Sequence, residues 1–270
     1  MRLAIARLDS SSQVGWPDET PDVVERLLAD RGLPLERWTV SAHGFENYLD
    51  ESDYPDWYLG GRRGGNPFFL EKALEHYVSL ELAGPKPDEI LIDVASNAGP
   101  FIGIARRLTG SVCYEQDLQF PRRVEGDRIG GDAADMPVVD AFADVMTLHC
   151  SYDHFEGSAD VGFVREAGRV LKPGGRLVIV PLYVGTSFGA KVDPRLRLPN
   201  LSLDRGMTRY LIPGLGERFS RLYDPPHLVS RVLEPAREAR LDWSILRVGG
   251  FSEVVPSGYL NFALILRKRS

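Results

Sequence analysis

The residues with the clearest chemical meaning lie where a short apolar run gives way to a helical pattern. Between Ile90 and Gly103 the chain reads Ile-Leu-Ile-Asp-Val-Ala-Ser-Asn-Ala-Gly-Pro-Phe-Ile-Gly. Small side chains after the acid let the backbone approach a bound molecule, and the N-terminus of the next helix faces that molecule. We expect a nucleotide-like ligand here, with an ordinary tight turn as the alternative. The expected contacts are Asp93, Ala95, Ser96, Asn97 and Gly99.

A second group of reactive side chains lies in the stretch from His149 to Glu156. An imidazole supported by a carboxylate titrates near neutrality and can take a proton from a hydroxyl group. His154, with Asp153 or Glu156 beside it, is therefore a candidate base, and a purely structural acid–histidine pair is the alternative. His149 is expected to line a ligand pocket more than to act as a base.

From Asp88 onward, short apolar runs alternate with helical patterns, which is typical of a parallel sheet covered on both faces. The ligands of such open sheets lie at the carboxyl ends of the strands. The predicted strands are 89–94, 111–115, 144–148, 177–181, 243–248 and 259–266. The predicted helices are 67–82, begun by Asn66 and Pro67, one from Phe101 that ends at Gly110, one through 163–171, and 227–240. Lys172 to Gly175 predicts a turn.

Two regions depart from this alternation. Residues 1–65 predict an N-terminal extension to a main domain at 66–270, and residues 183–240 predict an irregular insertion on the substrate side. The aromatic residues of the extension either close over the ligands as a lid or pack the extension onto the core. They are Trp16, Trp38, Tyr48, Tyr54, Trp57 and Tyr58.

Composition excludes several classes of protein. The 270 residues carry a net charge of -6, which is the opposite of a nucleic-acid-binding footprint. The two cysteines, Cys113 and Cys150, cannot form a disulfide framework and lack metal-ligand spacing, so we expect no metal site. No apolar run is long enough for a membrane helix, and no signal-peptide core is present near Met1. We expect a soluble, cytoplasmic protein that does not bind membranes.

Taken together, the motifs resemble those of the class I S-adenosylmethionine-dependent methyltransferases, of the type 11-like group. Four pieces occur in the family's order between Asp88 and Tyr183. They are the loop from Asp93 to Gly99, an acid after the second strand, Gly131-Asp132-Ala133 before the fourth strand, and Glu166 to Gly175 before the fifth. The family loop reads Asp-x-Gly-x-Gly-x-Gly, whereas Ala95 and Asn97 replace its first two glycines here. Alanine fits if its dihedrals stay negative, and Asn tolerates a positive φ.

The resemblance implies a Rossmann-like, doubly wound, mostly parallel seven-stranded sheet with helices on both faces. It also implies S-adenosyl-L-methionine as cofactor. Its ribose hydroxyls would bind Asp117, preferred over Glu115 because Leu118 then suits the adenine wall. Asp132 and the Ala133 N–H would bind the adenine, although a turn aspartate with only local bonds is the alternative for Asp132.

The expected function is methylation of a small molecule, on a hydroxyl of a sugar or secondary metabolite. Asp153 and His154 are the candidate catalytic residues, and the oligomeric state is open between monomer and homodimer. A non-catalytic ligand- or partner-binding module that retains the fold is the main alternative. A transferase that uses decarboxylated cofactor is a third reading. The glycine-poor loop motivates both alternatives.

Overall fold

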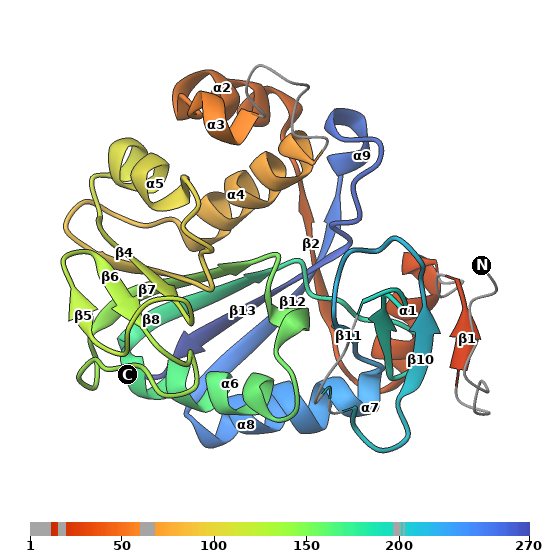
Figure 1. The fold of residues 1–270 in the computed structure, drawn as a ribbon. Helices are drawn as coiled ribbons and strands as arrows, with labels where there is room; N and C mark the ends of the chain where they lie inside the picture. Colours follow the sequence, from red (N-terminus) through yellow and green to blue (C-terminus); the bar gives the residue numbers. More distant parts are fainter. Residues whose placement is uncertain (1–11, 16–19, 60–67, 197–200, 202) are drawn as a thin grey trace.

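The computed structural model describes residues 12–15, 20–59, 68–196, 201 and 203–270. A large twisted sheet lies between two layers of helices, and a smaller sheet lies at one end (Figure 1). Helices α4 (Phe69–Ala83) and α5 (Phe101–Thr109) cover one face, where α2 (Ala42–Ser52) and α9 (Phe251–Val254) join the same apolar cluster. Helices α1 (Pro21–Asp30), α6 (Ala159–Val170) and α8 (Glu234–Glu238) cover the other face. The predicted α/β class with helices on both faces is confirmed.

The central sheet has the order β2-β12-β13-β8-β7-β3-β4-β6-β5 within the described residues. The strands are β2 (Leu35–Thr39), β3 (Ile90–Val94), β4 (Val112–Asp117), β5 (Val124–Glu125), β6 (Arg128–Gly130), β7 (Ala143–His149), β8 (Leu171–Val180), β12 (Leu241–Gly249) and β13 (Phe262–Lys268). All neighbouring strands are parallel except at β13 and β5. Six of these strands correspond to predicted ones, namely β3, β4, β7, β8, β12 and β13. The strands β2, β5 and β6 were not predicted.

The sequence explains the central strands and the first helix directly. β3 is almost wholly buried, as expected for an apolar run in a parallel sheet with both faces covered. α5 begins at Phe101 and ends at Gly110, whose φ of 74° gives the left-handed cap that glycine favours. The predicted start of α4 at Asn66 and Pro67 lies outside the described residues, and the helix is described from Phe69.

The predicted turn at Lys172 to Gly175 is present as an irregularity within β8. Ala143 of β7 pairs with Leu171, whereas Val145 pairs with Arg176, so four residues of β8 leave the regular ladder. Gly174 has a φ of 80° there, and a Cβ on Gly175 would lie 2.9 Å from the Lys172 carbonyl oxygen. The glycines therefore allow β8 to rejoin β7 in register.

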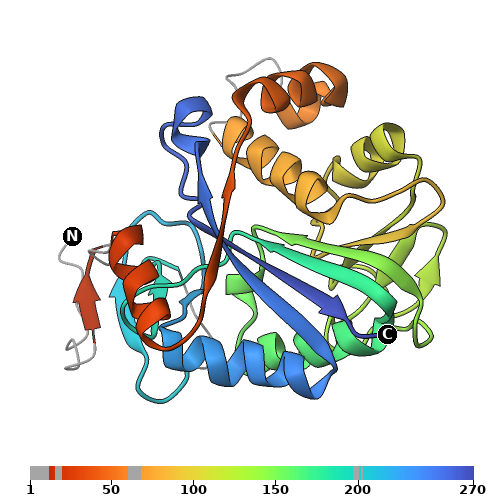
Figure 2. The ribbon, with the colours of Figure 1, turned by 180° about the vertical axis from the view of Figure 1, so that it is seen from behind.

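The N-terminal segment contributes to both sheets. β2 pairs in parallel with β12 at the edge of the central sheet, which the rear view shows clearly (Figure 2). β1 (Ser12–Val14) pairs with β10 (Thr208–Leu211) of the small sheet, which β9 (Gly189–Val192) and β11 (Ser220–Leu222) complete. α3 (Asp56–Leu59) lies beside α2. Trp16 lies outside the described residues, and the lid role of the aromatic cluster stays a prediction.

The predicted insertion therefore contains three strands and is not irregular throughout. The predicted helical segment that follows is divided into α7 (Pro225–Leu228), the π-helical η3 (Val229–Leu233) and α8. Asp224 caps α7, because its side chain accepts a hydrogen bond from the backbone N–H of His227.

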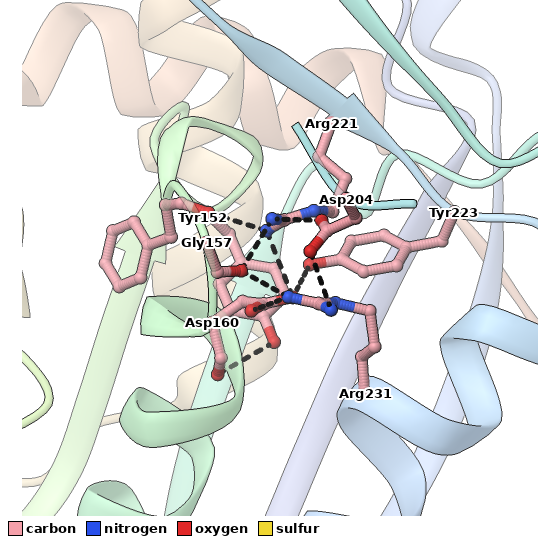
Figure 3. A network of polar contacts seen from close by, with 8 residues as sticks. Tyr152, Gly157, Asp160, Asp204, Arg221, Tyr223 and Arg231 are labelled. Carbon is pink, nitrogen blue, oxygen red and sulfur yellow. Dashed lines mark hydrogen bonds and ion pairs between the residues drawn. The ribbon is translucent and has the colours of Figure 1, made fainter. Parts of the chain in front are cut away.

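A buried ionic network joins the small sheet to the core (Figure 3). Arg221 of β11 is fully buried and lies 3.1 Å from the Asp160 carboxylate of α6. Arg231 of η3 binds both oxygens of Asp160, at 2.9 and 2.7 Å, and Tyr223 donates to the same carboxylate at 2.7 Å. Asp204 accepts a further hydrogen bond from Arg221 at 3.0 Å. Because two guanidinium groups share Asp160, this carboxylate fixes the small sheet on the core.

Asp160→Asn should lower the free energy of unfolding by about 3 kcal/mol, because it leaves two buried guanidinium groups undercompensated. Urea unfolding followed by circular dichroism measures the change. Glu238→Gln is the matched control. Glu238 forms an exposed ion pair with Arg165, so this variant should lose less than about 1 kcal/mol of unfolding free energy. Equal losses in the two variants would contradict the structural role of the network.

Candidate functional site

The loop after β3 has a left-handed backbone at three residues that are not glycine. Ala95, Asn97 and Ala98 have φ values of 54°, 51° and 51°. The positive φ agrees with the tolerance expected of Asn97, whereas Ala95 does not meet the condition of negative dihedrals under which alanine fits at little cost. Left-handed dihedrals cost an alanine roughly 1–2 kcal/mol. The loop thus keeps a glycine-type conformation without the glycines, and strain of this kind persists where the surroundings hold it in place.

Hydrogen bonds to β4 hold the strained loop. The backbone N–H of Asn97 donates to Oδ2 of Asp117 at 2.8 Å, and the N–H of Ser96 donates to the Gln116 carbonyl at 3.1 Å. The Gly99 N–H then donates to the Ser96 carbonyl at 3.0 Å, which closes the turn before α5. The loop is therefore folded over the carboxyl end of β4.

Asp117 and Glu115, the two candidates for ribose binding, have different surroundings. Glu115 lies level with Asp93 in the ladder and accepts a hydrogen bond at 2.8 Å from Arg128 of β6. Asp117 lies two residues nearer the edge, and its oxygens accept only backbone N–H groups, from Asn97 and from Gln119 at 2.9 Å. Asp117 has no ion pair among the described residues and borders the loop. Glu115 also lies 3.5 Å from the Ser96 hydroxyl of the loop, and the ribose-binding role preferred for Asp117 stays a prediction.

The predicted adenine contacts are mixed in character. Asp132 is exposed, and its carboxylate accepts the Ala134 N–H at 2.9 Å, which is the local bond of the alternative reading. Ala133 is buried beside it. Leu118 is 74% exposed at the end of β4. The adenine-binding roles of these residues stay predictions.

A buried acid–histidine pair lies at the ends of β3 and β7. Thr147 donates to Asp93 at 3.1 Å, and Nδ1 of His149 lies 3.5 Å from the same carboxylate oxygen without a hydrogen-bond partner. Burial, with a smaller contribution from Lys72, lowers the pKa of His149 from 6.5 to about 3. Burial also raises the pKa of Asp93 well above its ordinary value. His149 is therefore uncharged at neutral pH, and its role as a wall of the ligand pocket stays a prediction.

Aromatic rings connect His149 to the N-terminal segment. The His149 ring meets Phe101 at 4.5 Å and His76 of α4 at 4.6 Å between ring centroids. Nδ1 of His76 is hydrogen-bonded to the Tyr54 hydroxyl at 2.8 Å, and Tyr54 stacks on Tyr58. Tyr54 and Tyr58 of the predicted aromatic cluster are thus linked to His149 through His76.

His154 and Asp153 lie on the short helix η2 (Tyr152–His154), directly after β7. Nδ1 of His154 contacts the Phe219 carbonyl at 2.5 Å, and its Nε2 lies 3.9 Å from Asp153 and from Glu217. Asp153 itself is buried and accepts a hydrogen bond at 2.5 Å from Ser220 of β11. The carboxylate thus supports the small sheet more closely than it supports His154, and the catalytic role of the pair stays a prediction.

The sequence prediction missed a polar cluster on α4. Lys72 lies within 3.5 Å of Glu75, 3.2 Å of the Tyr259 hydroxyl and 2.9 Å of Cys150 Sγ, while Glu75 is 1% exposed. In the sequence Lys72 and Glu75 are polar residues at helical spacing, which ordinarily form a solvated face. No sequence signal marks them, because the burial of every residue of α4 from Ala73 to Leu80 appears only in the fold.

None of the helices described is long and apolar enough to cross a membrane. Among the described residues no group of three or more His, Cys, Asp or Glu side chains could hold a metal ion.

Comparison with known proteins agrees with the resemblance seen in the sequence. Residues 93–179 match the family model described as a methyltransferase domain. No curated protein matches this sequence significantly. Geranyl diphosphate C-methyltransferase from Streptomyces coelicolor A3(2) is 13% identical, with 86% of this chain and 100% of that chain covered at a TM-score of 0.46. The 1,6-didemethyltoxoflavin-N1-methyltransferase from Burkholderia thailandensis is 16% identical, with 88% and 94% covered at a TM-score of 0.46.

Ala98→Gly should raise the free energy of unfolding by about 1 kcal/mol, because Ala98 is exposed and glycine relieves its positive φ. Ala29→Gly is the matched control at an exposed position inside α1, where the same change should cost about 1 kcal/mol. Urea denaturation of the two variants measures both changes in the free energy of unfolding. A loss of stability in Ala98→Gly as large as that in Ala29→Gly would show that the loop is not strained.

His149 should make the protein less stable in acid. Its pKa is about 3 when folded and near 6.5 when unfolded, so between these values the unfolded chain binds more protons. The free energy of unfolding should therefore fall as the pH drops through this window, by up to about 1.4 kcal/mol per pH unit.

Urea unfolding of wild type and His149→Gln at pH 7, 6, 5 and 4 measures this contribution. The stability lost by the wild type should exceed that lost by His149→Gln. His43→Gln, at an exposed position of α2, should follow the wild type. A pH-independent difference between wild type and His149→Gln would exclude a buried neutral imidazole.

Proposed function

We propose that this chain, whose residues 93–179 match the model of a methyltransferase domain, is a class I S-adenosylmethionine-dependent methyltransferase that methylates an oxygen of a small molecule, a sugar or secondary metabolite. The observation that carries the proposal is the loop from Ala95 to Gly99, held over the end of β4 by the Asp117 carboxylate. The cofactor S-adenosylmethionine supplies a methyl group activated on a sulfonium. The chain's own residues at this edge of the sheet would bind and orient the reactants.

The residues at this edge fit the chemistry of the cofactor. Asp117 is buried and retains acceptor capacity beyond its two backbone N–H bonds, which suits a pair of ribose hydroxyls. Nδ1 of His149 is a buried polar atom with no hydrogen-bond partner among the residues that the structure describes, and it lies beside Asp93. Buried polar atoms are normally paired, so an orphaned one at this edge supports a ligand there.

The sheet topology supports the same location. β3 pairs with β4 on one side and with β7 on the other, so the chain changes direction in the sheet at β3. Ligands of open α/β sheets bind outside the carboxyl ends at such a switch point. An acceptor beside His149 would lie next to a cofactor beside Asp117, so the walls here could align the acceptor oxygen and exclude water.

Two assays on the full chain test the proposal. Calorimetric titration with S-adenosylhomocysteine should give micromolar binding, and a library of small acceptors with methyl-labelled S-adenosylmethionine should give labelled product. Binding without any product would favour the non-catalytic ligand-binding module. Folded protein that binds neither form of the cofactor would exclude the proposal.

Asp117→Asn should weaken S-adenosylhomocysteine binding roughly 10- to 100-fold, because a hydrogen bond to a charged group contributes about 1.5–3 kcal/mol. Glu115→Gln is the matched control and should change the Kd less than about threefold, since Glu115 already pairs with Arg128. Calorimetry on both variants measures the difference. A larger effect in Glu115→Gln would assign the ribose to Glu115 instead.

A further inference from the structure

The ammonium group of Lys72 is surrounded by groups from three separate parts of the chain. Its Nζ lies 3.5 Å from Glu75 and 3.3 Å from Glu71, both on α4. The Tyr259 hydroxyl, from the segment before β13, lies at 3.2 Å, and Sγ of Cys150 lies at 2.9 Å. The Lys72 side chain is still 26% exposed, whereas Glu75 is closed off from solvent. Lys72 and Tyr259, which is 36% exposed, are thus the members of this cluster most open to a ligand.

The cluster adjoins the proposed cofactor loop. Cys150 directly follows the last residue of β7, and the next residue, Ser151, donates a hydrogen bond to the Ala95 carbonyl at 3.3 Å. Lys72 therefore lies one residue away from a direct contact with the loop. A group bound to Lys72 would be a neighbour of whatever the loop binds.

The sulfur of Cys150 is a weak partner for the partly buried ammonium of Lys72. A thiol sulfur is a weak hydrogen-bond acceptor, and a charge removed from water needs strong partners. Cys150 also has a left-handed backbone, with a φ of 58°. A ligand oxygen that replaced the sulfur would give Lys72 a much stronger bond, so the contact suggests a position that a ligand takes over.

Lys72 can bind a negatively charged group but cannot act as a base, because it stays protonated at neutral pH. Burial lowers the pKa of Lys72, yet the nearby Glu75, Tyr259 and Glu71 outweigh this effect and raise it above its ordinary value. Burial also raises the pKa of Glu75 to about 8, against the opposing effect of Lys72. The ammonium therefore stays charged at neutral pH and would stabilise an oxyanion beside it.

One tyrosine ring adjoins Lys72 directly, since Nζ lies 5.8 Å from the Tyr259 ring centroid, and a second ring packs against that of Tyr259. Tyr183, which follows β8, stacks on Tyr259 with ring centroids 5.6 Å apart and an interplanar angle of 28°. Lys191 of β9 lies over the Tyr183 ring at 4.4 Å. Flat aromatic surfaces bind planar rings by offset stacking or edge contacts. The surroundings of Lys72 thus combine a cation with aromatic surface.

We infer that the acceptor is a planar ring compound with an acidic hydroxyl, a phenol or an enol, whose ionised oxygen binds Lys72 in place of the Cys150 sulfur. This inference rests on the proposed function and narrows its acceptor. The acceptor hydroxyl loses its proton to solvent as it binds, because the ammonium favours the oxyanion. The oxygen's electron pair then forms the new O–C bond, the C–S bond of the methyl donor breaks with its pair on sulfur, and no protein base is required.

The probe for this inference is 7-hydroxycoumarin, whose ionised form has its own absorbance band. Its titration is followed on the full chain saturated with S-adenosylhomocysteine, and its methylation is followed with labelled S-adenosylmethionine. The wild type should lower the pKa of the bound probe by about 1 unit or more. Lys72→Met should abolish the shift and slow methylation roughly 10-fold or more, whereas Lys72→Arg should retain most of the shift. Lys86→Met, at an exposed position after α4, is the matched control and should behave as wild type.

Each outcome separates the inference from the proposed function. An unchanged affinity for S-adenosylhomocysteine shows that Lys72→Met is folded and that only the acceptor side is altered. If the wild type binds S-adenosylhomocysteine but methylates methyl glucopyranoside and not the phenol, the inference is wrong and the proposed function stands. It is also wrong if neither probe binds, or if Lys72→Met keeps the shift and the rate. If the folded wild type binds no cofactor, the proposed function fails and this inference fails with it.

Discussion

The pairing of β3 with β4 on one side and β7 on the other is the constraint on which the site depends. Because the three strands are parallel and in register, Asp93, Glu115 and Thr147 occupy one row of the sheet. The residues that follow this row must emerge together at one edge. Asp117 and His149 meet the loop after β3 for this reason, although they are distant in sequence.

This edge is completed by elements outside the alternating strand and helix pattern. α4 brings Lys72 and Glu75 over the end of β7, and the small sheet presses against η2 through Ser220 and Asp153. The small sheet is fixed in turn by the buried carboxylate of Asp160. α4 and the small sheet thus lie on the side of this edge that is away from Asp117, which is where we propose that the acceptor binds.

The fold was largely predictable because apolar runs and helical spacing are local signals. The strands around Asp93 and His149 and the helix ending at Gly110 follow from them directly. The edge strand β2 could not be predicted, since its residues are only partly buried and pair with β12, some two hundred residues later. Lys72 was missed for a related reason: its importance comes from Cys150 and Tyr259, which only the tertiary fold brings to it. The positive φ of Ala95 could not be predicted either, because alanine favours a negative φ.

A crystal structure of the full chain with S-adenosylhomocysteine would decide whether this edge of the sheet binds the cofactor with its sulfur facing the proposed acceptor position. We expect the ribose at Asp117 and the sulfur directed towards Cys150 and Lys72. Density for the ligand at another edge, or a sulfur directed away from the end of β7, would contradict this expectation.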